Sequence, residues 1–245
     1  MEIEYENLTV VRGGRVVISG LSMSMKGPGL YQVIGPNGAG KTTLLLATMG
    51  VLKPAAGRVS IKPWGSASGV VAYVPQSFEL PEEAPVSTYE FVENYLVLWA
   101  KKRGVGVDVE ERARKALELV GIPRSLWSER LTRLSGGTMR RALIARALAT
   151  DAPIMLLDEP FSNIDPEGRV EVAELLGELS SSKLLVVTSH DPVLLLSYTK
   201  ELLLLGYGRH EHGPPSEIVK YEVLSRFYKK CAIEVEKHVH IADWH

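Results

Sequence analysis

The sequence lacks several features that define other classes of protein. Cys231 is its single cysteine among 245 residues, which excludes an internal disulfide and suits a reducing compartment. The net charge is −1 without a long basic run, so electrostatics gives no reason to expect a nucleic-acid partner. The most apolar stretches, such as 184–187 and 202–205, are far shorter than the roughly 18–20 residues that span a bilayer. A function at a membrane must therefore come from a partner.

The beginning of the sequence also lacks the pattern of a secretory signal peptide. Met1 leads directly into a strand-like segment, 3–10, without a charged region followed by an apolar core. We therefore expect a cytoplasmic location. A length of 245 residues with 45% hydrophobic residues favours one α/β domain with a substantial core.

A glycine-rich stretch is the most informative part of the chain. It reads GPNGAGKTT and consists of Gly35, Pro36, Asn37, Gly38, Ala39, Gly40, Lys41, Thr42 and Thr43. This is the pattern of the phosphate-binding loop, whose backbone N–H groups converge on phosphate oxygens. Lys41 would place its charge near the β and γ phosphates of a nucleotide, and the Thr42 hydroxyl would bind Mg²⁺. A predicted buried strand over 30–34 precedes the loop, and a predicted helix over 41–49 points its positive end at the anion.

Further short motifs follow the loop along the chain. They are Gln76 after a predicted strand, LSGG at 134–137, IMLLDEP at 154–160, SNID at 162–165 and His190 in TSHD. Together with the loop, they resemble the Q-loop, signature, Walker B strand, D-loop and switch histidine of the ATP-binding cassette (ABC) ATPases. The resemblance extends from residue 35 to 191 and implies a P-loop NTPase fold of the α/β class. Such a fold has a RecA-like core, an antiparallel β subdomain and an inserted helical subdomain.

Two carboxylates end the apolar run at 154–158. A run that ends in Asp158 and Glu159 is typical of a buried parallel strand whose carboxyl end opens on a ligand crevice. Asp158 would hold Mg²⁺, and Glu159 would polarise the water that attacks the γ-phosphate. By resemblance, Gln76 contacts Mg²⁺ and this water, and His190 donates a hydrogen bond to the γ-phosphate. Without the loop nearby, the same residues would indicate only turns and a solvated loop.

The signature motif begins a predicted helix. Ser135, Gly136 and Gly137 would place a hydroxyl and N–H groups at the positive end of this helix. Alone they would be typical of an ordinary loop, but the resemblance implies that they complete the ATP site of a second subunit in a head-to-tail dimer. Asp165 precedes Pro166 and an amphipathic run, which predicts an N-cap. We expect Asp165 also to contact the dimer partner.

Two positions depart from the family pattern. Thr138 stands where most relatives carry glutamine, and we expect the site to tolerate it because Ser135 and the two glycines supply more of the phosphate contact. Arg12 lies near the position of the aromatic residue that stacks on adenine. A guanidinium can also stack on a base, which contributes about 0.5–1 kcal/mol at an exposed site. Arg12 is therefore either a base contact, which leaves base selectivity open, or an ordinary surface residue of a hairpin turn.

The remaining patterns divide the single domain, residues 1–245, into three parts. We expect the core at about 1–79 and 151–225, a mostly helical insert at about 80–150 and a tail at about 226–245.

The insert carries two clear helix signals and an aromatic stripe. Ser87 begins a capping box, and Asp108 begins a second helix that ends at Gly121. By resemblance, the groove between insert and core receives a helix of a membrane permease. The aromatic residues between Phe78 and Trp99 are candidates for this contact, or they form the core of the insert.

The end of the chain contains GPPSEIV at 213–219, LSRFY at 224–228 and a histidine-containing segment from 238 to 245, and the segment 78–87 follows Gln76. These segments resemble those of the zinc and manganese uptake group of the family. The resemblance implies ATP and Mg²⁺ as cofactors, membrane permease subunits and a second ATPase subunit as partners, and an extracellular substrate-binding protein reached through the permease. It also implies a peripheral location on the inner face of the cell membrane. The alternative is a soluble ABC ATPase that drives assembly, for example of iron–sulfur clusters, without a membrane subunit.

Metal-binding residue types are also grouped near the end of the sequence. They are Cys231, His238, His240, Asp243 and His245. In an extended strand His238 and His240 would share one face and could bind Zn²⁺. A solvated segment without a metal is the alternative.

Overall fold

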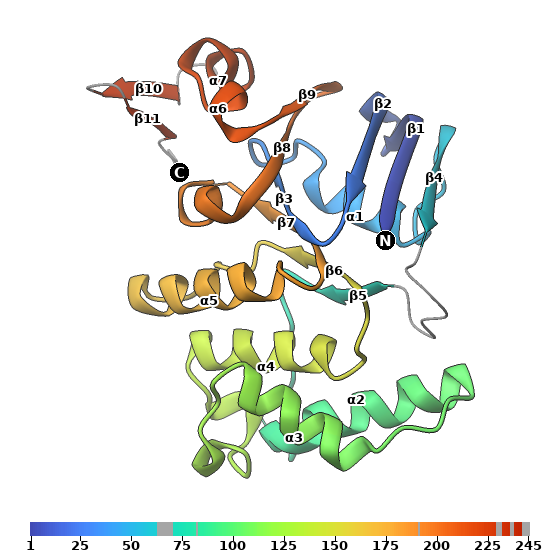
Figure 1. Cartoon of the computed structure of the whole chain (residues 1–245), viewed down its shortest axis with the longest axis vertical. Helices are drawn as coiled ribbons and strands as arrows, with labels where there is room; N and C mark the ends of the chain where they lie inside the picture. Colours follow the sequence, from blue (N-terminus) through green and yellow to red (C-terminus); the bar gives the residue numbers. More distant parts are fainter. Residues whose placement is uncertain (63–70, 82, 191, 229–231, 236–237, 242–245) are drawn as a thin grey trace.

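A six-stranded sheet forms the centre of the molecule (Figure 1). The computed structural model describes residues 1–62, 71–81, 83–190, 192–228, 232–235 and 238–241. In chain order, the central strands are β3 (Gly29–Ile34), β5 (Val71–Val74), β6 (Ile154–Asp158), β7 (Leu184–Ser189), β8 (Thr199–Gly206) and β9 (Arg209–Gly213). They lie in the order β5-β6-β7-β3-β8-β9, and all are parallel except β9, which is antiparallel to β8. A mainly parallel sheet covered by other elements confirms the expected α/β class.

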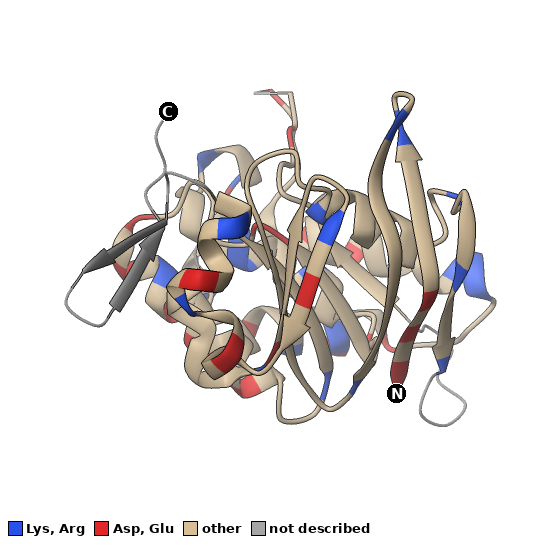
Figure 2. Ribbon diagram, turned by 90° about the horizontal axis from the view of Figure 1, so that it is seen from above, with Lys and Arg blue, Asp and Glu red and all other residues tan. Residues whose placement is uncertain are grey.

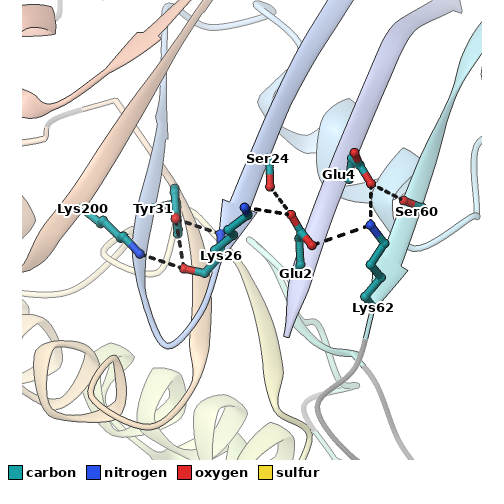
Figure 3. A network of polar contacts seen from close by, with 8 residues as sticks. All are labelled: Glu2, Glu4, Ser24, Lys26, Tyr31, Ser60, Lys62 and Lys200. Atoms are coloured by element: carbon teal, nitrogen blue, oxygen red, sulfur yellow. Dashed lines mark hydrogen bonds and ion pairs between the residues drawn. The ribbon is translucent and has the colours of Figure 1, made fainter.

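A second, antiparallel sheet shares a hydrophobic core with the central one. Its strands are β1 (Glu2–Arg12), β2 (Arg15–Lys26) and β4 (Ala56–Lys62), in the order β2-β1-β4. A polar network ties the two sheets together at one end (Figure 3). The Tyr31 hydroxyl of β3 donates to the Lys26 carbonyl (3.0 Å) and accepts from the Lys26 N–H (2.9 Å). Lys200 of β8 donates to the same carbonyl (3.1 Å), so Lys26 holds the end of β2 against two central strands.

Alternate residues of the central strands belong to two separate cores, as the period of two in a strand requires. In β6, Ile154 and Leu156 share a core with the antiparallel sheet and α1 (Lys41–Thr48). Met155 and Leu157 share the other core with helices that include α4 (Gly136–Leu148) and α5 (Pro166–Leu179). All four side chains are fully buried. Because both faces of β6 are covered, the polar residues that follow it are held in a fixed position.

The chain between β5 and β6 is mostly helical and lies at the opposite end of the molecule from β9 (Figure 1). Its elements are α2 (Thr88–Arg103), α3 (Val109–Leu119), the 3-10 turns η1 (Arg124–Leu126) and η2 (Leu131–Arg133), and α4. The predicted capping box is confirmed, because Ser87 and Glu90 each accept from the other's backbone N–H. Asp108 caps α3 as expected, and Gly121 follows its end with a φ of 68°.

The aromatic stripe of this region belongs largely to its core. Phe78 and Phe91 contact each other with ring centroids 5.0 Å apart. The guanidinium of Arg146, from α4, lies 5.1 Å from the Phe78 centroid, 4.9 Å from that of Phe91 and 4.8 Å from that of Tyr95. Trp99 is also partly buried against the same core. The core interpretation is therefore correct for Phe91, whereas Phe78 and Trp99 lie at the margin of the core and Tyr95 is half-buried beside Arg146.

The last part of the chain adds short elements beyond those predicted from the sequence. They are η3 (Val193–Tyr198), β9, α6 (Pro215–Ile218), α7 (Tyr221–Tyr228), β10 (Ala232–Val235) and β11 (His238–Ile241). Residue 226, the expected start of the tail, falls inside α7, which buries Leu224, Phe227 and Tyr228. Cys231, Asp243 and His245 lie outside the described residues, so a metal site in the tail stays a prediction. Within the described part of the chain, no cluster of three or more metal-ligating side chains occurs, and no helix has the length and apolarity of a membrane span.

Candidate functional site

A cavity of about 380 Å³ lies where the glycine-rich loop leaves β3. It is lined by Arg12, Arg15, Val17, Asn37, Gly38, Ala39, Gly40, Lys41, Thr42, Thr43, Gln76 and Glu159. The structure thus brings the loop together with Gln76, which follows β5, and Glu159, which follows β6. Three basic side chains and one acidic side chain line this cavity, and this balance favours an anionic ligand.

The loop places the positive end of α1 at the cavity. Gly40 is the N-cap of α1 and has a φ of 105°, which a residue with a side chain rarely adopts. Because Gly40 has no side chain, it cannot accept from the first N–H groups of the helix. These groups are therefore suited to an anion in the cavity. The predicted strand and helix on either side of the loop are confirmed as β3 and α1.

Three charged or polar side chains form a line beside the loop. The buried Lys41 ammonium donates to the Gly35 carbonyl (2.8 Å) and lies 3.2 Å from Glu159 Oε1. The second oxygen of Glu159, Oε2, lies 3.1 Å from His190 Nδ1. Burial opposes ionisation of Glu159, but the hydrogen bond to His190 and the charge of Lys41 outweigh it and lower the pKa of the Glu159 carboxyl. Glu159 is therefore an ionised carboxylate at neutral pH, held between two nitrogen groups.

Asp158 is fixed by two side chains that the sequence motifs do not single out. The Thr188 hydroxyl donates to Asp158 Oδ1 (2.6 Å) and accepts from the backbone N–H of Glu159 (2.9 Å). The Tyr73 hydroxyl donates to Asp158 Oδ2 (3.3 Å). Burial, together with the negative charge of Asp158, raises the pKa of Tyr73, so its hydroxyl remains a donor at neutral pH. A polar residue near the end of an apolar strand, two residues before His190, is the signal that could have identified Thr188.

The signature residues lie apart from this cavity. Ser135 is the N-cap of α4, and its hydroxyl accepts from the Thr138 N–H (3.2 Å) and lies 2.9 Å from the Thr138 hydroxyl. Gly136 packs so closely against the Asn163 carbonyl that a β-carbon would collide with it. Asp165 caps α5 by accepting from the Gly168 N–H (3.3 Å), which confirms the predicted cap. These contacts join the signature turn to the D-loop segment.

The hairpin between β1 and β2 supplies the outer wall of the cavity. Arg12 and Arg15 are paired across the turn, and both are exposed. Figure 2 shows basic residues near the tip of this long hairpin. Arg12 lines the cavity, as an interaction with the base would require, but its contact with a base stays a prediction. Arg15 and Val17 were not expected at the site. The pairing of two arginines around a Gly-Gly turn is the sequence signal that could have identified Arg15.

The family of the chain follows from comparison with known proteins. The model of the ABC transporter family matches residues 18–162, which is more than half of the chain. The manganese transport system ATP-binding protein MntB of Listeria monocytogenes is 33% identical over 231 residues, which cover 92% of this chain and 95% of that protein. The zinc import ATP-binding protein ZnuC of Pseudomonas savastanoi is 32% identical over 252 residues, which cover 99% of this chain and 88% of that protein.

Solved structures agree with this family. A dimeric bacterial ABC transporter cassette has a TM-score of 0.72 and 26% identity, covering 85% of this chain and 97% of that one. A chain of an inward-facing transporter, provisionally described as metal-chelate type, has a TM-score of 0.84, and the match covers 99% of this chain and 97% of that one. Its sequence identity is 24%, so it supports the fold alone. The resemblance seen in the sequence motifs is confirmed. The chain belongs to the ABC transporter family, as one of its ATP-binding, ATP-hydrolysing subunits.

Proposed function

We propose that this chain binds ATP with Mg²⁺ in the loop cavity, forms a head-to-tail homodimer and energises import of a transition-metal cation through a membrane permease. The choice of a transition-metal cation rests on similarity, over almost the whole chain, to ATP-binding proteins of manganese transport and zinc import. The proposed ATP hydrolysis rests on the contacts of Glu159 with Lys41 and His190. Each role below rests on these two observations.

The loop would hold the nucleotide phosphates. Backbone N–H groups at the start of α1 would donate to phosphate oxygens, with the Thr43 N–H among them. The Lys41 ammonium would supply the full positive charge between the β and γ phosphates. Asn37 and Ala39 line the cavity, and Pro36 precedes them in the loop. Arg12 at the hairpin would lie over the base.

The oxygen groups beside the loop fit Mg²⁺, a hard cation that prefers oxygen ligands. Thr42 offers a hydroxyl and Gln76 an amide oxygen, and both line the cavity. The Asp158 carboxylate is oriented by Thr188 and Tyr73 for an interaction through water. When bound, Mg²⁺ would neutralise part of the charge on the β and γ phosphates. The donor set thus agrees with the expected cofactor.

Glu159 would act as the general base for hydrolysis. Its lowered pKa keeps the carboxyl group deprotonated at neutral pH, as a group that accepts a proton from water must be. The Thr188 hydroxyl accepts from the backbone N–H of Glu159, which fixes the main chain from which the carboxylate extends. His190 contacts this carboxylate and would donate a hydrogen bond to the γ-phosphate. Hydrolysis would therefore depend on Glu159 more than on any other side chain of the cavity.

A second subunit would complete each ATP site. Ser135 and Gly136 are exposed at the start of α4, and Asp165 is exposed beside them. Ser135, Gly136 and Gly137 would contact the γ-phosphate bound by the partner, and Asp165 would contact the partner subunit itself. The groove between the helical insert and the core would receive the permease on the inner face of the membrane. An extracellular substrate-binding protein would deliver the cation to the outer face of that permease.

Transport in proteoliposomes tests this proposal. The chain is co-expressed with candidate multi-span membrane proteins from its own genome, a complex that forms is reconstituted, and ATP-dependent uptake of Zn²⁺, Mn²⁺ and Ca²⁺ is measured. We expect uptake of Zn²⁺ or Mn²⁺ with the wild-type chain and none with a Glu159→Gln complex. The relatives favour transport over the alternative of a soluble assembly ATPase. Uptake of neither cation, together with no membrane protein that co-purifies with the chain from detergent-solubilised membranes, would instead support that alternative.

A further inference from the structure

Arg140 is a buried basic residue to which the sequence motifs assign no role. It lies in the second turn of α4, the helix that begins at the signature residue Ser135. Its side chain is 5% exposed. Burial lowers the pKa of its guanidinium, although the charge of Asp158 opposes this effect. An arginine in such a place requires polar partners, because an unsatisfied buried cation is strongly unfavourable.

The guanidinium of Arg140 binds two separate segments at once. It donates to the Pro75 carbonyl (2.7 Å) and to the Gln76 carbonyl (2.7 Å), which fixes the main chain of the Q-loop residue. It also donates to the hydroxyl of Ser162 (2.8 Å), the first residue of the D-loop segment. A guanidinium presents several N–H donors in a rigid plane, so it can hold these three acceptors together.

Ser162 extends the contact to the proposed catalytic base. Its hydroxyl donates to the Glu159 carbonyl (2.9 Å), and its backbone N–H donates to the same oxygen (3.1 Å). Glu159 has a φ of 45°, a conformation that residues with side chains rarely adopt. The unusual backbone of Glu159 is thus connected through Ser162 to a side chain of the signature helix.

We propose that Arg140 is a positioning residue that fixes Gln76 and Glu159 relative to the signature helix α4. When the signature end of α4 meets the ATP of a partner subunit, the same helix would set the positions of the proposed Mg²⁺ contact and the proposed base. This inference rests on the functions proposed above for Gln76 and Glu159. It assigns to Arg140 an effect on turnover and on Mg²⁺ dependence, and none on the binding of ATP by the loop.

The neighbouring arginine provides a matched control. Arg141 lies on the same helix and forms an ion pair with Glu171 of α5 (2.6 Å), away from Gln76 and Ser162. The variants Arg140→Gln and Arg141→Gln therefore make the same chemical change at adjacent positions. Nucleotide affinity, kcat, the Mg²⁺ concentration for half-maximal rate and Tm are measured for both full-length proteins. Arg140→Lys, which keeps the charge but offers one ammonium, is measured in parallel.

We expect Arg140→Gln to lower kcat at least ~10-fold and to raise the half-maximal Mg²⁺ concentration, because small displacements of catalytic groups are costly. Nucleotide affinity should stay within about twofold, and Arg141→Gln should leave kcat within about twofold as a partly exposed ion pair predicts. Arg140→Lys should show an intermediate kcat. If Arg140→Gln does not fold, the comparison of Arg140→Lys with the wild type decides, and equal kcat and Mg²⁺ dependence overturn the inference.

Two other results overturn it. A fall in nucleotide affinity equal to the fall in kcat, or an equal loss in Arg141→Gln, would show that Arg140 only stabilises the packing of α4. Normal kcat in Arg140→Gln, together with lost ATP binding in Lys41→Ala, would reject the role of Arg140 and leave the proposed function intact. Normal behaviour of both Lys41→Ala and Glu159→Gln would instead reject the proposed function itself.

Discussion

The loop cavity and the signature turn (residues 134–137) both lie at the start of a helix, but one is buried in a cavity and the other is exposed on the surface. Each is built at the start of a helix, α1 or α4, where backbone N–H groups lack intrahelical partners. At α1, the helix begins inside a cavity, and Lys41 and Glu159 are almost fully buried there. At α4, the helix begins on the surface with the exposed Ser135. One chain therefore holds a phosphate cavity and a second, exposed helix start, which in the proposed dimer would contact the nucleotide of the partner.

The charges of the first helical turns support this comparison. Among the described helices of eight residues or more, α1 and α4 have no acidic residue in the first turn, whereas α2, α3, α5 and α7 each have at least one. An acidic side chain there would neutralise the positive end of the helix dipole. Both helices thus keep a positive end, which is consistent with phosphate binding at both places.

The largest expected effect is at the loop. Lys41→Ala should weaken ATP binding by at least roughly 10²-fold, because it removes the buried positive charge that faces the phosphates. Titration with ATP measures the affinity. Lys183→Ala is a suitable control, because Lys183 is also mostly buried but pairs with Asp151 outside the cavity. Near-normal affinity in Lys41→Ala would contradict the assignment of the loop.

The next effect separates binding from chemistry within the cavity. Glu159→Gln should retain ATP and Mg²⁺ binding and slow hydrolysis at least about 10²-fold, the usual scale for the loss of a general base. The variant should also dimerise when ATP is added, as measured by light scattering. Hydrolysis at the wild-type rate, or a monomer at saturating ATP, would show that the two regions do not cooperate as proposed.

A third change tests the signature turn alone. Ser135→Arg places a large side chain on an exposed position, so the fold and the ATP affinity of the monomer should stay unchanged. In the Glu159→Gln background it should abolish ATP-dependent dimerisation. Ser181→Arg, at another exposed serine, is the matched control.

Mixing two inactive variants gives a sharper form of this test. Lys41→Ala keeps its signature turn, and Ser135→Arg keeps its loop. In a head-to-tail dimer of the two, one site combines the intact loop with the intact turn, so hydrolysis should reappear on mixing. No recovery would argue that loop and signature turn act within the same chain.

The smallest expected effect concerns the hairpin. If Arg12 stacks on the base, Arg12→Ala should weaken ATP binding by no more than about 1 kcal/mol, and Arg12→Tyr should preserve or improve it. Titrations with ATP and GTP would also show how selective the contact is. Equal affinity in all three proteins would place Arg12 away from the base.

The sequence predicts the elements around the site better than the contacts between them. The strand that ends at Asp158 and the helix that follows Asp165 have clear apolar and capping patterns, and both are confirmed. The bond between Thr188 and Asp158 depends on β6 and β7 being neighbours with these residues in register. One sequence does not reveal strand order, so the contacts of Thr188 and Arg140 could not be predicted. The limits of the three parts of the domain stay a prediction.

Strand β9 shows a different reason for a missed element. It reads RHEHG and has no apolar alternation, because it forms the edge of the sheet beside β8. Hydrophobic periodicity can identify only strands that bury at least one apolar face. The helix α6 has only four residues, which is too short to establish a helical period. The helix α7 does show the period, with Tyr221, Leu224 and Tyr228 at i, i+3 and i+7, so its sequence contained a signal that could have identified it.

The strand order also has a consequence for protein synthesis. The strand that carries the loop, β3, lies between β7 and β8, and more than half of the chain separates it from both in sequence. A growing chain therefore makes its nucleotide loop early but cannot pair β3 within the central sheet until β7 has left the ribosome. Such distant pairings are slow steps in folding. The ability to bind ATP is thus acquired late, and it marks a chain whose central sheet is already assembled.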